Sequence, residues 1–280
     1  MAFDWSDTST VGKINCDSNS VIALTFLNQK VYVIHGNSSH IQVYDSVTLN
    51  WVSEFKLEDV DEPNELTACA VNNLLYLACR KDQTVYKAES NGSKVLLKWK
   101  TDEDSYNLST TKKGNVIMAG LMKRALKEHT QHGILLRTII LKSDVGVDMN
   151  PWIALELESG NYLICHGESR ARKHRVCVIT SNGDVLKSFG NEKGSGVDRL
   201  FGPYHLVVDE IGNILVADCN NHRIVVLSPN LQYLTEIKAD LRLPVKLCID
   251  STTGTLYVAD NEFQGAKQAN GQIVVFKIKH

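Results

Sequence analysis

Long hydrophobic runs are missing from the sequence. The longest apolar stretches, such as Val21 to Leu27 and Ile134 to Leu136, fall far short of the roughly 20 residues that a helix needs to span a bilayer. Residues 1–15 contain acidic side chains and no apolar core, which argues against a secretory signal peptide. We therefore expect a cytoplasmic protein without a membrane segment. Three Asn-x-Ser/Thr sequons leave an extracellular location open as the alternative.

The chain also lacks an excess of charge of either sign. Thirty Lys and Arg residues are balanced by thirty-two Asp and Glu residues, so the formal net charge is -2. An obligate nucleic-acid binder is usually basic overall. We expect no binding to duplex DNA, and RNA binding only through a local basic patch.

Metal-binding and catalytic motifs are absent as well. None of the Cys residues forms a Cys-x-x-Cys pair or a zinc-type spacing with His. Five of the seven lie in apolar runs and are expected to be buried thiols: Cys69, Cys79, Cys165, Cys177 and Cys248. Gly-x-Ser-x-Gly, P-loop and dinucleotide motifs do not occur, and we interpret Gly194-Ser195-Gly196 as part of a flexible loop. The domain is expected to be non-enzymatic, with no catalytic residue, metal or cofactor.

One unit recurs along the chain. Residues 203–227 and 244–276 share a Val/Ile-Asp pair, a turn glycine and a Val-Ala-Asp strand end. Weaker copies occur at residues 21–38, 65–82, 109–120 and 151–169. The turn residues of the six units are 42 to 52 residues apart, close to the ~40 to 50 of propeller blades: Asn28, Asn72, Gly114, Gly160, Gly212 and Gly254.

These units predict an all-β fold, a six-bladed β-propeller of four-stranded antiparallel blades that occupies residues 1–280 as a single domain. The blades are expected at residues 18–58, 63–101, 105–142, 150–190, 201–239 and 242–280. The strands of blade five are expected at residues 204–209, 213–217, 223–227 and 232–237. The sixth unit has only three strands, so residues 2–15 should supply its fourth and close the ring. Residues 121–129 are interpreted as a loop or a strand despite their helix-like composition.

The segment at residues 203–227 resembles the NHL repeat, because it carries the triplet Asn221-His222-Arg223 after the Val-Ala-Asp strand end. Blade six has residues 263–270 inserted where that triplet belongs, and blades one to four keep only the hydrophobic framework and turns. The resemblance implies a six-bladed NHL propeller such as ends the TRIM-NHL ubiquitin ligases, without the RING domain that ligase activity requires. Propellers of that family recognise RNA in some members and proteins in others.

Basic residues gather in the loops that should join second to third strands. Those loops and the connections between blades should emerge on one face, where an arc of cations would attract phosphates. The residues of this arc are Arg80, Lys81, Lys123, Arg124, Lys127, His129, His132, Arg170, Arg172, Lys173, His174, Arg175, His222 and Arg223.

Aromatic residues should lie at the channel mouth on the same face. Trp152 and Tyr204, next to His205, could stack on bases. We therefore predict that the domain binds single-stranded RNA, for post-transcriptional regulation.

Structural roles compete with this hypothesis. Arg223 is more readily explained by pairing with a repeat aspartate such as Asp218 or Asp260, and Asp209 and Asp250 by capping turns. Trp152 could simply wedge between blades, and residues 170–175 could form only a solvated loop. The acidic connections after blades one and two make the face bipolar, which favours the alternative of a protein partner.

Two enzyme types known among six-bladed propellers fit less well. A zinc lyase needs several channel histidines, and only His205 lies at a suitable position. A calcium-dependent, lactonase-like hydrolase needs several oxygen ligands at the axis. Asn64, Glu65 and Asn107 could supply some of them, but Lys246 is unsuited. The calcium enzyme is kept as a second alternative.

Overall fold

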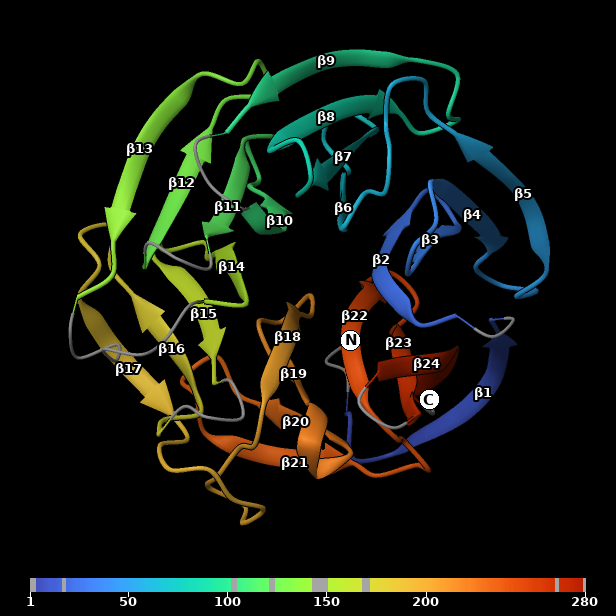
Figure 1. Ribbon diagram of the computed structural model, residues 1–280. Helices are drawn as coiled ribbons and strands as arrows, with labels where there is room; N and C mark the ends of the chain where they lie inside the picture. The colour runs from blue at the N-terminus through green and yellow to red at the C-terminus, as the bar shows by residue number, and fades with distance from the viewer. Residues whose placement is uncertain are drawn as a thin grey trace.

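The computed structural model is a closed ring of six antiparallel sheets, each with four strands (Figure 1). This architecture confirms the prediction of a six-bladed, all-β propeller. The structure describes residues 4–16, 19–101, 105–120, 124–142, 151–167, 172–264 and 267–278.

The first three blades use consecutive strands that run from the centre of the ring to its rim (Figure 1). Blade one contains β2 (Val21–Leu27), β3 (Lys30–His35), β4 (His40–Asp45) and β5 (Trp51–Lys56). Blade two contains β6 (Glu65–Cys69), β7 (Leu74–Cys79), β8 (Thr84–Glu89) and β9 (Val95–Lys100). Blade three contains β10 (Ser105–Thr110), β11 (Val116–Gly120), β12 (Ala125–His129) and β13 (Leu135–Ile140).

The other three blades complete the ring. Blade four contains β14 (Ile153–Glu156), β15 (Tyr162–His166), β16 (Arg175–Ile179) and β17 (Val185–Phe189). Blade five contains β18 (Pro203–Val208), β19 (Ile214–Asp218), the 3-10 turn η2 (Cys219–Asn221), β20 (Arg223–Leu227) and β21 (Tyr233–Ile237). Blade six contains β22 (Pro244–Asp250), β23 (Thr255–Gln264), β24 (Lys267–Ile278) and β1 (Thr8–Asn15).

The N-terminal strand closes the ring, as predicted. β1 pairs antiparallel with β24 from Thr8 opposite Ile278 to Asn15 opposite Gln272. Trp5, just before β1, is buried, and its indole Nε1 donates a hydrogen bond to Asp209 Oδ2 in blade five at 2.8 Å. The N-terminal segment therefore completes blade six through β1 and contacts blade five through Trp5.

The turns between first and second strands explain the repeated Gly and Asn residues. Each turn contains a residue in the left-handed region, where glycine and asparagine are favoured. Gly212 has φ +88° and Asn28 has φ +50°. In blade two this residue is Asn73 (φ +57°), the neighbour of the predicted Asn72.

Repeat aspartates stabilise the same region. Asp209 accepts hydrogen bonds from the backbone N–H groups of Ile211 (3.1 Å) and Asn213 (2.7 Å), which confirms its turn-capping role. Asp250 likewise accepts from the N–H of Thr252 at 3.0 Å.

Six clusters of buried apolar residues form the core, one at each junction between neighbouring blades. At the junction of blades one and two, Ile34 and Ile41 belong to the same cluster as Leu66 and Leu75. A single blade cannot bury its apolar faces alone, so each one depends on both neighbours.

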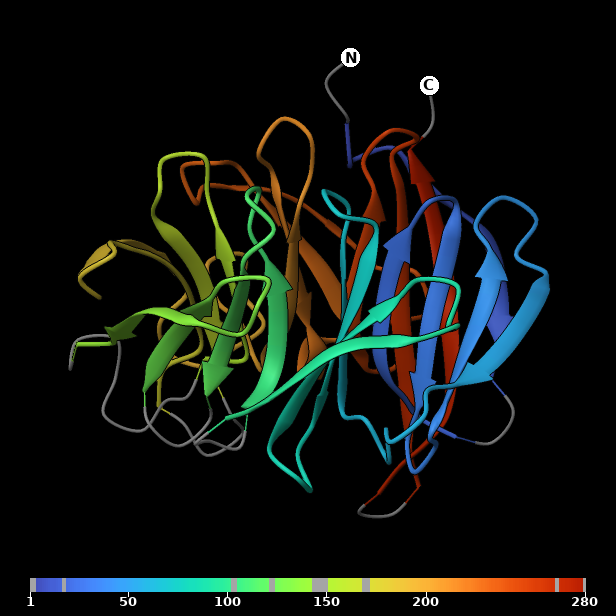
Figure 2. The ribbon, with the colours of Figure 1, turned by 90° about the horizontal axis from the view of Figure 1, so that it is seen from above.

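The connections fall at two opposite ends of the blades (Figure 2). The β7–β8 connection extends toward the bottom of that view. Residues 125–129 form strand β12, so the prediction that Lys127 and His129 lie in a second-to-third-strand loop is wrong. His132 is in the β12–β13 hairpin, which lies at the other end of the blade. No described helix has the length and apolar character required to cross a membrane.

Candidate functional site

The predicted basic arc is only partly exposed. Arg80 and Arg172 are exposed, whereas Arg124, Lys127 and Lys173 are half-buried. Lys123 and Arg170 lie outside the described residues.

Two further members of the arc are exposed but engaged. Lys81 is exposed and forms a salt bridge with Asp61, its Nζ 3.3 Å from Oδ2. His222 is exposed, and its Nδ1 contacts the backbone carbonyl of Arg242. Of the predicted arc, exposed or half-buried cations therefore remain on the loops of blades two to four.

Arg223 is buried, so the prediction that it lies on an accessible rim is wrong. Its side chain is only 3% exposed, and its Nε donates to Asp218 Oδ2 at 2.8 Å, as the competing structural interpretation expected. The guanidinium also pairs with Glu236 at 2.6 Å. Residues 190–202 form an insertion between β17 of blade four and β18 of blade five. The guanidinium donates to three carbonyls of this insertion: Ser195 (3.1 Å), Gly196 (3.1 Å) and Arg199 (2.8 Å). All five N–H groups of the guanidinium thus have acceptors.

His174 and Arg175 are also buried, contrary to their prediction as rim residues. His174 Nδ1 accepts a hydrogen bond from the backbone N–H of Gly202 at 3.0 Å. Arg175 begins strand β16 and pairs in register with His166 on β15. These side chains belong to the interior of blade four and its junction with the insertion.

Trp152 and Tyr204 contact each other at the channel mouth. Their rings are stacked, with centroids 4.6 Å apart and an interplanar angle of 23°, and both residues are half-buried. This contact joins blade four to blade five. It supports the interpretation of Trp152 as a wedge between blades, and each ring uses one face in the stack.

A buried ion pair crosses the channel beside these rings. Lys246 Nζ contacts Glu65 Oε2 and Asn107 Oδ1, the latter at 2.5 Å, although the three residues lie on three different blades. The Lys246 and Glu65 side chains are 12% and 4% exposed. Burial raises the pKa of Glu65, and the charge of Lys246 opposes that shift. These residues border a cavity of about 170 Å³ with Trp152 and Tyr204.

The ion pair bears on the enzyme alternatives. The Glu65 and Asn107 oxygens, which a calcium site would need, are bonded to an ammonium group. His205 is buried, and burial, reinforced by Lys246, holds its pKa well below the ordinary value. Within the described ranges, no three His, Cys, Asp or Glu side chains cluster as metal ligands.

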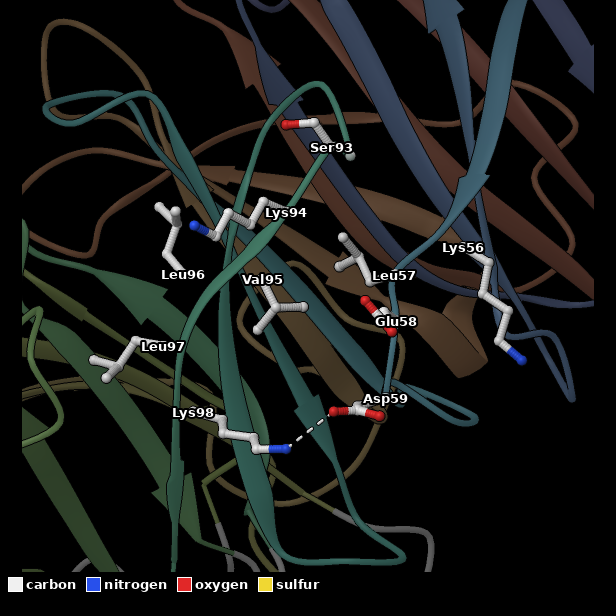
Figure 3. A pocket seen from close by; sticks show the side chains of 11 residues that line it. Lys56, Leu57, Glu58, Asp59, Ser93, Lys94, Val95, Leu96, Leu97 and Lys98 are labelled. Carbon is white, nitrogen blue, oxygen red and sulfur yellow. Dashed lines mark hydrogen bonds and ion pairs between the residues drawn. The ribbon is translucent and has the colours of Figure 1, made fainter.

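A larger groove lies on the side of the ring between blades one and two (Figure 3). Its volume is about 610 Å³. One wall is the chain that leaves β5, residues 56–59, and the other is the β8–β9 turn with β9, residues 92–98. Leu57 is buried and Val95 is half-buried there, and Figure 3 shows these two side chains facing each other between the charged ones, with Leu97 on the other side of β9.

Charged side chains line the same groove. Lys98 Nζ and Asp59 Oδ2 form a salt bridge of 3.2 Å across it (Figure 3). At the turn, Gly92 (φ +75°) lies so close to the Phe55 ring that an added Cβ would be 2.3 Å from ring atoms. This contact fixes the β8–β9 turn against β5. The combination of a mixed-charge rim and an apolar floor was not among the sites predicted from the sequence.

Comparisons with known proteins identify the fold alone. No family model and no curated protein matches the chain. Virginiamycin B lyase from Staphylococcus aureus aligns over 98% of this chain and 100% of its own, with 11% identity and a TM-score of 0.64. The Cps50 (Swd1) β-propeller domain of Myceliophthora thermophila aligns over 97% and 100%, with 9% identity and a TM-score of 0.63. Hydrazine synthase from Kuenenia stuttgartiensis aligns over 88% and 94%, with 11% identity and a TM-score of 0.63.

Proposed function

We propose that this propeller is a non-enzymatic domain that recognises another protein. The observation that carries the proposal is the groove between blades one and two, where apolar side chains form the floor and lysines and acids form the rim. Protein interfaces combine an apolar centre with a polar rim in this way. The NHL-like segment at residues 203–227 and the propeller fold are consistent with such a role.

RNA recognition is the competing proposal. Fewer of the predicted RNA-contacting side chains are accessible than the sequence suggested. Arg223, His174 and Arg175 are buried, and the Trp152 and Tyr204 rings stack on each other. Nucleic-acid affinity depends on accessible cations that release counterions from phosphates. Among the described arginines of the arc, Arg80, Arg124 and Arg172 are exposed or half-buried, so these are the side chains that an RNA site would use first.

Parallel selections from a random peptide library and a random single-stranded RNA pool would test the proposal. We expect peptides to be enriched and to bind the purified domain with dissociation constants in the micromolar range, about -8 kcal/mol. A triple variant, Arg80→Ala, Arg124→Ala and Arg172→Ala, is the control, and it should leave peptide binding unchanged.

The opposite pattern would contradict the proposal. Sequence-dependent RNA binding that disappears in the triple variant, with no peptide enriched, would establish the domain as an RNA reader.

A further inference from the structure

Strand β9 has a free hydrogen-bonding edge along the groove. The strand order of blade two is β6-β7-β8-β9, so among the described strands β9 pairs with β8 alone. The groove is lined by residues of β9 and, opposite them, by residues 56–59. An unpaired edge presents N–H and C=O groups that an extended peptide can pair with.

A β-bulge at Leu96 interrupts the alternation of β9, so that Val95 and Lys98 face the groove whereas Leu97 and Trp99 lie on the face toward blade three. Leu96, Lys98 and Lys100 are exposed, and Val95, Leu97 and Trp99 between them are half-buried. Leu96 is 42% exposed although it is apolar. A strand added beside β9 would place an apolar side chain toward Leu57 and Val95 and polar ones toward the lysines.

The charges of the groove specify the polar residues of that strand. Lys98 is paired with Asp59, and the charge of Lys56 acts on the Asp61 carboxyl, whereas Lys94 forms no salt bridge with a described acid. Glu58 is the other acid of the groove, so its lining of three lysines and two acids has a net charge of +1. A carboxylate that approaches Lys94 gains attraction without displacing an existing pair.

We propose that blade two takes up an extended segment of its partner as an additional strand along β9. The segment carries alternating apolar residues and at least one Asp or Glu, which faces Lys94. Main-chain hydrogen bonds to β9 give affinity, and the apolar floor and Lys94 give specificity. This inference rests on the proposed function, because it names the partner chemistry and the binding mode of the same groove.

Backbone N-methylation of an enriched peptide tests the binding mode. Methylation removes one N–H donor at a time, and in a paired strand every second N–H faces the neighbouring strand. We expect a loss of about tenfold or more in affinity at alternate positions and little change at the positions between them. Docking through side chains alone would give no such period.

Two protein variants test the location. Leu96→Asp should weaken peptide binding by about tenfold or more. Leu234→Asp is its matched control, because Leu234 is an exposed residue (51%) of β21, the outer strand of blade five. Lys94→Glu should weaken binding of the acidic peptide, and replacing the peptide acid with Lys should restore it.

The outcomes distinguish a failure of strand addition at β9 from a failure of protein recognition. Peptides that bind with no periodic effect of N-methylation, or equally well to Leu96→Asp, would overturn strand addition at β9 while protein recognition stands. A domain that enriches no peptide and selects RNA would overturn protein recognition, and the inference with it.

Discussion

Replacing Arg223 with Met would reveal how strongly one buried arginine ties blade five to the 190–202 insertion. The substitution keeps an apolar stem but removes the charged partner of Asp218, whose side chain is fully buried. Losing one partner of a buried ion pair destabilises a protein by about 3–5 kcal/mol. The N–H of Phe201 (2.6 Å) and the amide of Asn221 (2.8 Å) still donate to Asp218. We therefore expect a loss near the lower limit, about 3 kcal/mol.

The loss should also depend on pH. Burial raises the pKa of Asp218 even in the native protein, and without Arg223 that pKa should rise further. A raised folded-state pKa contributes stability at low pH that is lost as pH rises. The variant should therefore lose more stability at about pH 8 than at about pH 5.

Urea unfolding gives the magnitude, with Arg242→Met as the control. Arg242 also pairs with an acid, Glu262, at 2.7 Å, but its side chain is 55% exposed, so its loss should cost about 0–1 kcal/mol. Hydrogen exchange should accelerate in residues 190–202 of the Arg223 variant, since three carbonyls there lose their donor. Equal, small losses of stability in both variants would show that the buried Arg223 pair contributes no more than the exposed Arg242 pair.

Three further predictions follow from burial and ring closure. Deleting residues 1–15 removes β1 and the Trp5 contact, so thermal unfolding should shift to lower temperature and the exposed β24 edge should promote aggregation; an unchanged midpoint would contradict ring closure by β1. Burial, with nearby cations, lowers the pKa of His166 to about 3, so stability should fall by up to about 1.4 kcal/mol per unit as pH drops below about 6.5, and His166→Gln should flatten the slope measured by urea unfolding. All seven cysteines are buried, and burial raises the pKa of Cys79 to about 12; a thiol reagent should therefore react slowly until urea unfolds the chain, and rapid labelling of the native protein would disprove this.

Repetition made the fold predictable from the sequence. A turn residue every 42 to 52 positions sets the number of blades, because each blade needs one left-handed residue between its first two strands. In blade five the observed β18 and β21 begin within one residue of their predicted starts at residues 204 and 232. The three-stranded sixth unit correctly predicted its partner, β1.

The candidate sites were less predictable because they form between segments that share no pattern. Arg223 was assigned to the rim from its loop position, but the acceptors that bury it include carbonyls of the irregular 190–202 insertion. That insertion, interpreted as a flexible loop, is tied to blade five by these bonds. The groove joins residues 56–59 of one blade connection to residues 92–98 of the next blade. Its one sequence signal is the alternation in Val-Leu-Leu-Lys-Trp-Lys at β9.

A crystal structure of the domain with a peptide enriched from the random library would show directly whether the domain binds a partner segment beside β9. We expect the peptide to lie as an extended strand beside β9, with an apolar side chain over Leu57 and Val95 and a carboxylate near Lys94. A peptide bound instead at the channel mouth against Trp152 and Tyr204, or over the loops that carry Arg124 and Arg172, would contradict it.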